Sequence, residues 1–353
     1  MTPLVSICLP SLNTRPFLKE RFDSIYQQTF QDWELFVYDS HSDDGSWEFI
    51  CDVAAKDKRV RVAQGPRDGV YPAWNECLKE TRGEFVYIAT SDDSMSPDLI
   101  EKMVAALELH QDCELAHCPL VIVDERSRQV KEPTWPDCTV FADGLPDIST
   151  PHVWRAPYSG LMQLSGRHVI LSITQLLIRR SIFARIGNFS NRWGSASDFH
   201  WEMKAGLVAN MVHVPDTSAT WRIHSNQATN ESRGISRQDY FQKIDDMIRH
   251  AVAESEALLP EGIASDLKSS VLRSSEELRS YYLGLFHRVS PTQRRLYQAL
   301  QVLRGTPSVR REILKRIAGK PKWSDNVGCE VRQWLKSRGL QPLVRCSEPT
   351  GHS

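Results

Sequence analysis

The stretch YIATSDDSM, residues 87–95, begins as a buried strand and then turns polar. Its strand part continues an apolar run that begins at Glu84, and Asp92 and Asp93 follow it side by side, shortly before Pro97. Two adjacent carboxylates repel each other, so their charge must be offset. One interpretation is a divalent cation, because Mg²⁺ and Mn²⁺ prefer oxygen ligands. The other is structural, with Asp92 capping a helix near Pro97 or forming an Asx turn.

Around this stretch, residues 1–120 alternate short apolar runs with segments of helical periodicity. Strands are predicted at 5–9, 34–38, 59–63 and 84–89, and helices at 17–26, 46–54, 71–80 and 97–110. This alternation predicts an α/β fold with a mostly parallel sheet and helices on both faces. In such sheets ligands bind beyond the carboxyl ends of the strands. The turns after Leu9, Tyr38 and Ala89 are therefore the expected site.

The second half of the chain has a different pattern. From Cys113 to about Asn230 it is mixed, with strands predicted near 116–123 and 175–178, and helical periodicity returns beyond Ser232. We therefore predict one domain over 1–230 and a helical C-terminal region over 231–353. Within the latter, residues 304–340 carry ten basic and three acidic side chains. They form either a solvated helical face or a contact with an anionic membrane surface or a lipid-linked acceptor.

Composition narrows the class of protein. The 353 residues are 41% apolar and 25% charged, as in soluble globular proteins, and the net charge of −1 gives no reason to expect a nucleic-acid partner. No segment approaches the roughly 20 apolar residues that span a bilayer, and the N-terminus lacks a signal-peptide pattern. We expect a cytoplasmic protein, either soluble or peripheral on the inner membrane face. Eight cysteines without a CxxC pair favour buried free thiols over disulfides or zinc.

Other polar residues extend the predicted site. Asp39 ends the strand at 34–38, so parallel strands would place it along the same sheet edge as the acids after Ala89. Asp198 stands among aromatic residues before a helical run, where partial desolvation suits a general base; the alternative is an ordinary helix cap. Arg222 and His224 alternate to one face of an extended segment. They suit phosphate or metal contacts, or else form the polar face of an edge strand.

Taken together, the first 230 residues resemble the family 2 glycosyltransferases, which are inverting enzymes with the GT-A nucleotide-sugar-binding fold. The likeness rests on the order and spacing of residues 5–13, 24–35, 39–46, 69–75, 83–88, 92–93, 198 and 222–224. The resemblance implies a GT-A, Rossmann-like sheet flanked by helices, with the helical region as a C-terminal extension. It fades past about residue 230.

The resemblance also implies roles for individual residues. Those implied to bind the nucleotide-sugar donor are Pro10, Ser11, Asn13, Asp39, Asp68, Gly69, Asp92 and Arg222. Among them, Asp39 would accept a hydrogen bond from the base, and Asp92 would face the ribose or sugar. Asp93 and His224 would hold Mn²⁺ or Mg²⁺ at the diphosphate. Asp198 would be the catalytic base.

The implied activity is transfer of a sugar from a metal-bound nucleotide-diphosphate donor to a hydroxyl group. The acceptor would be a glycan or a lipid-linked molecule, in the synthesis of a bacterial surface polysaccharide. Two alternatives stay open: a catalytically degenerate carbohydrate-binding or scaffolding subunit, and a nucleotidyltransferase. The presence of Asp93, Asp198 and His224 together favours an enzyme. An NAD enzyme is disfavoured because no G-x-G-x-x-G follows Leu9.

Overall fold

The computed structural model describes residues 2–130, 149–164, 169–225, 227, 237–260, 262–265, 332–333 and 335–346. The strands among them are β1 (Val5–Ser11), β2 (Trp33–Asp39), β3 (Val60–Gln64), β4 (Phe85–Ile88), β5 (Cys113–His117), β6 (Leu120–Val123), β7 (His152–Trp154), β8 (Leu176–Arg179), β9 (Asn210–His213), β10 (Ala219–Arg222) and β11 (Leu343–Arg345). The α-helices are α1 (Arg15–Tyr26), α2 (Ser46–Ala54), α3 (Val70–Glu80), α4 (Leu99–Leu109), α5 (Tyr158–Leu164), α6 (Ser181–Ile186), α7 (Ser197–Val208) and α8 (Arg237–Ser255).

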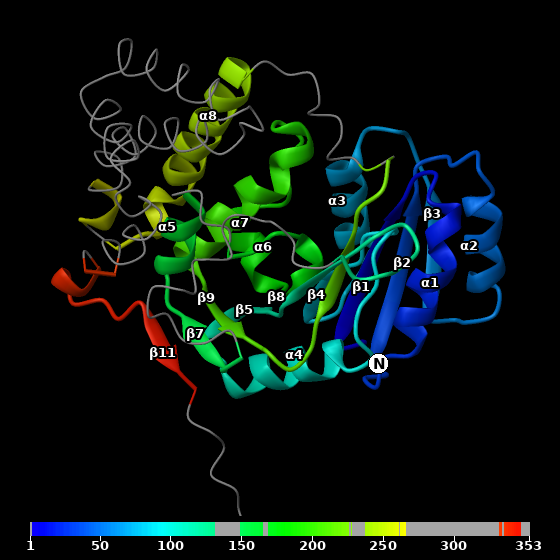
Figure 1. Ribbon diagram of the computed structural model, residues 1–353, viewed down its shortest axis with the longest axis horizontal. Helices are drawn as coiled ribbons and strands as arrows, with labels where there is room; N and C mark the ends of the chain where they lie inside the picture. Colours follow the sequence, from blue (N-terminus) through cyan, green and yellow to red (C-terminus); the bar gives the residue numbers. More distant parts are fainter. Residues whose placement is uncertain are drawn as a thin grey trace, which may run out of the picture.

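Nine of these strands form one sheet in the order β11-β7-β9-β5-β8-β4-β1-β2-β3. The pairs β1/β2, β1/β4, β2/β3 and β5/β9 are parallel. Strands β7 and β8 run against their neighbours, so the other seven share one direction. The predicted mostly parallel α/β sheet is confirmed. Figure 1 shows β1–β3 with α1 and α2 at one end of the molecule and α5, α7 and α8 at the other.

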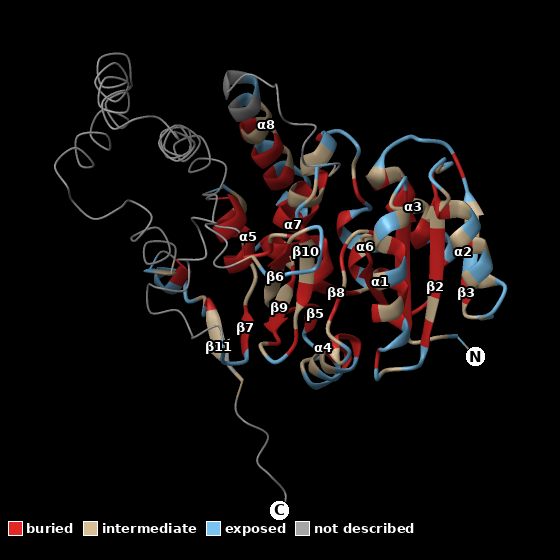
Figure 2. Cartoon of the chain, turned by 45° about the vertical axis from the view of Figure 1, so that its right-hand side comes forward, coloured by how far each residue is buried: buried red, intermediate tan, exposed pale blue. Residues whose placement is uncertain are grey.

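Each face of the sheet carries its own hydrophobic core. Because side chains alternate along a strand, Ile7 and Leu9 of β1 pack against α1, α2 and α4, whereas Cys8 points to the face covered by α3 and α5–α8. Strands β2 and β8 and helix α7 are mostly buried (Figure 2). Each fully buried aliphatic side chain contributes about 1.5–3 kcal/mol. The two cores therefore hold the strand ends rigidly in place.

The predicted elements of residues 5–109 are confirmed with small changes at their ends. The helix predicted at 46–54 is α2, and the strand predicted at 34–38 is β2, one residue longer at each end. Strand β1 runs on to Ser11, through Pro10. Proline lacks the N–H donor, but residue pairing with β2 continues across it as far as Ser11 and Asp39. The polar edge of the sheet thus begins two residues later than the sequence predicts.

The single strand predicted near 116–123 is wrong, because the chain there forms two strands in different sheets. Strand β5 belongs to the nine-stranded sheet, whereas β6 pairs in parallel with β10 in a separate two-stranded sheet. The break falls at Pro119, which has no N–H to donate. The Cys118 amide instead donates to the Gln175 carbonyl at 3.1 Å. This small sheet places β10 beside the turn that follows β4.

The C-terminal region is helical at its start but not throughout. Helix α8 packs on α7, and its Glu254 accepts a hydrogen bond from the buried Lys204 at 2.9 Å. Residues 343–345, predicted to be part of a helical region, instead form β11, which pairs antiparallel with β7. A strand of three residues has little signal of its own, and the sheet edge supplies its hydrogen bonds. The domain boundary at residue 230 stays a prediction.

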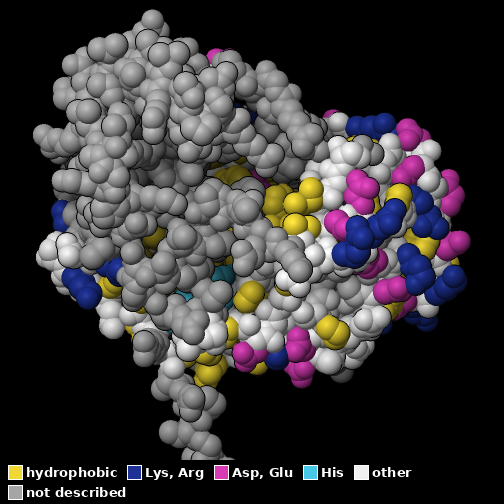
Figure 3. All heavy atoms as spheres, in the orientation of Figure 1, with side chains coloured by type: hydrophobic (Ala, Val, Ile, Leu, Met, Phe, Trp, Pro, Cys, Tyr) yellow, Lys and Arg dark blue, Asp and Glu magenta, His cyan; other side chains and the backbone are white. Residues whose placement is uncertain are grey.

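Three further predictions concern the chemistry of the chain. Cys8, Cys51, Cys77, Cys113, Cys118 and Cys346 are free thiols, as predicted; Cys138 and Cys329 lie outside the described residues. Among the described helices, none is both long and apolar enough to cross a membrane. Acidic and basic side chains are intermixed at the end of the molecule formed by β1–β3 and α2 (Figure 3). Most of the basic segment 304–340 falls outside the described residues.

Candidate active site

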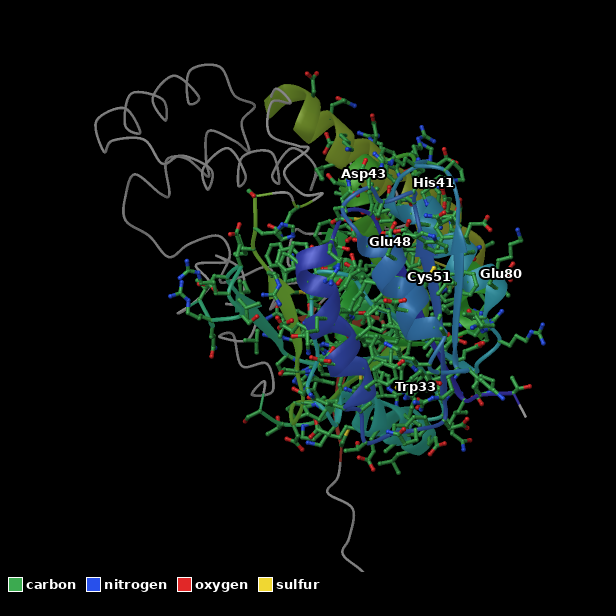
Figure 4. The ribbon with its side chains drawn as sticks, turned by 90° about the vertical axis from the view of Figure 1, so that its right-hand side faces the viewer. Trp33, His41, Asp43, Glu48, Cys51 and Glu80 are labelled. Carbon is green, nitrogen blue, oxygen red and sulfur yellow. The ribbon has the colours of Figure 1, made fainter. Side chains whose placement is uncertain are left out.

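The carboxyl ends of β1 and β2 meet at one edge of the sheet. Ser11 and Asp39 are partners in register, and both are buried. Beyond them, Asn13 clamps the two loops together, because its amide Nδ2 donates to Asp43 at 2.9 Å and its Oδ1 accepts from the Asp43 amide at 2.9 Å. Figure 4 shows Asp43 and His41 at the opposite end of the molecule from Trp33, where β2 begins. Polar loops thus gather at this edge, as predicted.

Asp39 closes its own turn. Its Oδ1 accepts from the Ser42 amide at 2.9 Å and from Gln64 Nε2 at 3.1 Å, and its Oδ2 accepts from Ser42 Oγ at 2.6 Å. The side chain has no exposed surface. A carboxylate has about four acceptor sites, so one remains on Oδ2. The predicted contact with the base is therefore limited to that oxygen and stays a prediction.

The loop after β3 bends over the loop after β2. Arg67 Nε donates to the Ser40 carbonyl at 3.2 Å, and its guanidinium pairs with Asp43 at 2.8 Å. Gly69 follows and has φ = +112°, which residues with a Cβ rarely adopt. It is the residue immediately before α3. The Asp68 carbonyl accepts from Asn191 Nδ2 at 3.2 Å, while the Asp68 side chain is exposed. Asp68 and Gly69 thus border the same edge, and their predicted contact with the donor stays a prediction.

Asp92 and Asp93 face opposite ways. Asp93 is 2% exposed; its Oδ1 accepts from the Arg222 amide at 2.7 Å, and its Oδ2 accepts from the Thr90 hydroxyl. Burial, and then the charge of Asp92, raises the pKa of Asp93 to about 8. Asp92 keeps 24% of its side chain exposed and its Oδ2 lies 2.9 Å from His224 Nε2. Of the predicted metal ligands, Asp93 is therefore turned inward, and His224 lies beside Asp92. Their role at a metal stays a prediction.

Arg222 is an internal support of this turn. Its side chain is 1% exposed, pairs with Glu20 at 2.8 Å and lies over the Phe17 ring at 5.1 Å. Its Nε donates to the Asp92 carbonyl at 2.6 Å, and its Nη1 donates to Ser127 Oγ at 2.9 Å. A guanidinium engaged in this way orients the backbone of the acidic turn. Its predicted contact with the donor stays a prediction.

Asp198 lies in the first turn of α7 and is half-buried. Its Oδ1 accepts from the Tyr71 hydroxyl at 3.0 Å and from the Phe199 amide at 3.0 Å. Burial raises the pKa of Asp198, these hydrogen bonds lower it, and the net result is a pKa of about 6. Glu202, one turn further along α7, is buried, and burial followed by the charge of Asp198 raises its pKa well above the usual range. Burial thus disfavours the charged form of both carboxyl groups.

Several residues at this site are absent from the sequence prediction. Tyr71 is among them, because its partner is 127 residues away and no local pattern links the two. Thr90 and Glu202 are also missed, since a single polar residue in an apolar context carries no signal of its partner. The segment 69–75 is part of the family resemblance, but its periodicity indicates only a helix. Burial around a hydroxyl or carboxyl is a property of the folded chain.

Two side chains at the acidic turn, Asp92 and His224, are candidate ligands of a divalent cation. Among the described residues, no group of three or more histidine, cysteine or acidic side chains is arranged to hold a metal ion. Mg²⁺ is commonly held by one or two protein groups together with substrate phosphates. The Asp92 carboxylate and the His224 imidazole provide two such groups at 2.9 Å from each other. They fit a metal that arrives with its nucleotide.

Comparison with known proteins adds sequence and structural relatives. The family model described as glycosyl transferase family 2 matches residues 6–187 of the 353. The uncharacterized glycosyltransferase EpsJ of Bacillus subtilis is 33% identical over 111 residues, 31% of this chain and 32% of EpsJ. Hyaluronan synthase of Pasteurella multocida is 23% identical over 239 residues, 68% of this chain and 22% of the synthase. The matches thus span a third or less of these two relatives.

Solved structures match over nearly the whole chain. S. aureus TarS 1–349 in complex with UDP-GlcNAc aligns with a TM-score of 0.56 and 16% identity, over 96% of this chain and 93% of that one. The mannosyltransferase PcManGT of Pyrobaculum calidifontis, in complex with GDP-Man and Mn²⁺, aligns with a TM-score of 0.54 and 16% identity, over 96% and 85%. These likenesses confirm the predicted GT-A fold. With the family model covering just over half of its residues, the chain belongs to glycosyl transferase family 2.

Proposed function

We propose that this protein is an inverting glycosyltransferase that takes a sugar from a nucleotide-diphosphate donor. The acceptor is a hydroxyl of a glycan or lipid-linked molecule in bacterial polysaccharide synthesis. The observation that carries the proposal is Asp198, a half-buried carboxylate with one hydrogen-bonded oxygen and a pKa of about 6. A general base works best with a pKa near the operating pH. A binding subunit has no use for such a group.

The proposed reaction uses Asp198 to accept the proton of the acceptor hydroxyl. As that proton leaves, the hydroxyl oxygen bonds to the anomeric carbon, and the bond from this carbon to the donor phosphate oxygen breaks on the opposite face. Positioned base catalysis contributes typically about 10²–10⁴-fold. A single base and no covalent intermediate then give inversion.

The donor is placed at the edge formed by β1, β2 and the turn after β4. We assign Asp92 and His224, ahead of the buried Asp93, as the groups that hold a divalent cation. A bound Mn²⁺ or Mg²⁺ would offset the charge of the leaving diphosphate. Asp93 and Arg222 then support the backbone of the acidic turn. Relatives of the same fold bind UDP-GlcNAc and GDP-Man with Mn²⁺, which supports this donor class.

Thermal-shift measurements with UDP-GlcNAc and GDP-Man, in Mn²⁺ or EDTA, test the proposal. One donor at about 100 times its Kd stabilises the protein by about 2.7 kcal/mol, a rise of a few degrees in Tm. We expect this rise only with Mn²⁺. It should be lost in Asp92→Ala and His224→Ala and retained in Asp198→Asn, which slows turnover.

Asp57→Ala is the matched control for these variants, because Asp57 pairs with Arg59 before β3, at the other end of that strand. It should bind the donor like the wild type. If neither nucleotide sugar raises the Tm with or without metal, a carbohydrate-binding subunit replaces the proposed enzyme.

A further inference from the structure

The two oxygens of the Asp198 carboxylate have different surroundings. Oδ1 accepts two hydrogen bonds, from the Tyr71 hydroxyl and the Phe199 amide, each at 3.0 Å. Within the described part of the chain, no residue donates a hydrogen bond to the other oxygen, Oδ2. The Phe199 amide belongs to the same helix turn, so any acid at this position would have it. The Tyr71 hydroxyl comes from α3, on a different part of the fold.

We propose that Tyr71 is a positioning residue for the base. By occupying Oδ1 it holds the carboxylate plane still and leaves Oδ2 as the oxygen that takes the acceptor proton. The inference rests on the proposed function, since it assigns a role within the same reaction. Tyr71 itself touches neither the sugar nor the reacting hydroxyl in this account.

Tyr71 is held rigidly enough for such a role. Its side chain is 3% exposed and packs edge-on against Trp74, with ring centroids 4.9 Å apart. Asn75, one turn further along α3, exchanges two hydrogen bonds with Phe189, at 2.8 and 3.1 Å. That pair joins α3 to the chain that leads into α7. A buried, packed tyrosine loses little further freedom when it orients a partner.

The same helix connects the base to the donor side of the site. Gly69 immediately precedes α3, and the carbonyl of Asp68 accepts from Asn191 Nδ2, three residues before the 3₁₀ turn Gly194–Ala196 that leads to Asp198. The first turn of α3 therefore contacts both the loop that borders the donor edge and the carboxylate.

Tyr71 acts as a donor and not as a second acid. Burial, and then the charge of Asp198, raises the pKa of Tyr71 well above its usual value. The hydroxyl therefore keeps its proton throughout the working pH range and donates to the carboxylate. A hydrogen bond to a charged acceptor is roughly twice as strong as a neutral one. It stabilises the ionised form of Asp198, which is the form that accepts a proton.

Tyr71→Phe removes the hydroxyl and keeps the ring. Release of UDP from UDP-GlcNAc, or GDP from GDP-Man, would be followed with Mn²⁺ from pH 5 to pH 9. We expect kcat at pH 7 to fall about tenfold and its acid limb to move up by about one pH unit, since a charged hydrogen bond is worth roughly one pKa unit. KM for the donor should stay within about twofold.

Tyr87→Phe is the matched control. Tyr87 is buried in β4 and belongs to the hydrophobic core on the other face of the sheet from Tyr71. The same deletion there should change neither kcat nor the acid limb. A Tyr71→Phe profile that overlays the wild type overturns the inference and leaves the proposed function standing. A wild type that releases no nucleotide from either donor contradicts the proposed function instead.

A second measurement does not depend on turnover. The unfolding free energies of Tyr71→Phe, Asp198→Ala and the double variant form a cycle that isolates the pair. Because the hydrogen bond strengthens when Asp198 is ionised, the coupling should be larger at pH 8 than at pH 5. A coupling that is absent, or equal at both pH values, would show that the tyrosine only fills space.

Discussion

Two groups of buried or half-buried ionisable side chains belong to the same face of the sheet and differ in their hydrogen bonds. One is Asp198 with Glu202 on α7. The other is a row of three histidines on adjacent strands: His117 of β5, His213 of β9 and His152 of β7. The histidine rings lie 4.5 and 4.7 Å apart between centroids. Both groups are covered by the core formed with α3 and α5–α8.

Burial disfavours the charged form in both groups, so the pKa values move in opposite directions. It raises the pKa of Asp198 to about 6, lowers that of His152 to about 4, and lowers that of His117 well below its usual value. Asp198 is supplied with two donors on one oxygen. Neither ring nitrogen of His117 has a hydrogen-bond partner within the described residues. A buried group keeps its charge near neutral pH only where the fold supplies partners.

The largest expected effect comes from Asp198→Asn, which removes the charge and keeps the shape. We expect kcat to fall about 10²–10⁴-fold, because the amide cannot accept the proton. The variant should also be more stable than the wild type at pH 8, by about 2 kcal/mol, since it buries no charge. Rates of nucleotide release and urea unfolding measure the two effects.

The sign of the pH dependence follows from the raised pKa of Asp198. Between its usual value of 3.8 and about 6, the folded protein binds a proton that the unfolded chain has lost. The stability gained by Asp198→Asn should therefore be full above pH 6 and disappear as the pH falls to about 4. An equal gain at pH 4 and pH 8 would mean that the charge on Asp198 is not the cause.

Gly206→Ala tests whether packing of α7 maintains this burial. A Cβ at Gly206 would lie 2.6 Å from the Gly160 amide nitrogen and 2.9 Å from its Cα, both backbone atoms of α5. Overpacking of this kind costs roughly 1–3 kcal/mol, and we expect about 2 kcal/mol from urea unfolding. Gly160→Ala meets the same clash, at 2.3 Å from the Leu207 amide nitrogen. The two changes should therefore not be additive.

An effect no larger than that of Gly206→Ala is expected in the row of buried histidines. The unfolding free energy of the wild type should fall as the pH drops below about 6.5, because the histidines of the unfolded chain bind protons and the buried imidazoles do not. His117→Leu removes one such group, so the loss between pH 7 and pH 5 should shrink by about 2 kcal/mol. Chemical unfolding at the two pH values measures it. Identical losses in both proteins would show that His117 is charged in the fold.

Local patterns were sufficient for the elements of residues 5–109. Helix α2 matches its prediction at both ends, because polar turns and apolar periodicity coincide there. Local patterns were insufficient for β6, β10 and β11, because the strands that pair with them lie far away along the chain. A strand of three or four residues is stabilised by the strand beside it. Its existence depends on pairing, which no local window contains.

The site divides in the same way. Asp39, Asp92 and Asp198 were predictable because strand ends, a polar turn and a helix start place them. The inward turn of Asp93 was not, since the local sequence does not show which of two adjacent acids faces the core. It follows from the Arg222 amide of β10, which is 129 residues away and donates at 2.7 Å. Tyr71 is a partner of Asp198 for the same reason.

The sequence by itself determined the α/β alternation, the polar edge at the strand ends and the membership of the family. These features depend on the order of residue types along the chain, because interactions between residues close in sequence determine them. Only the tertiary structure decided which acid faces outward, which oxygen of Asp198 is left open and which histidines lose their charge. Those outcomes depend on burial and on neighbours far away along the chain, so they exist only after the chain has folded.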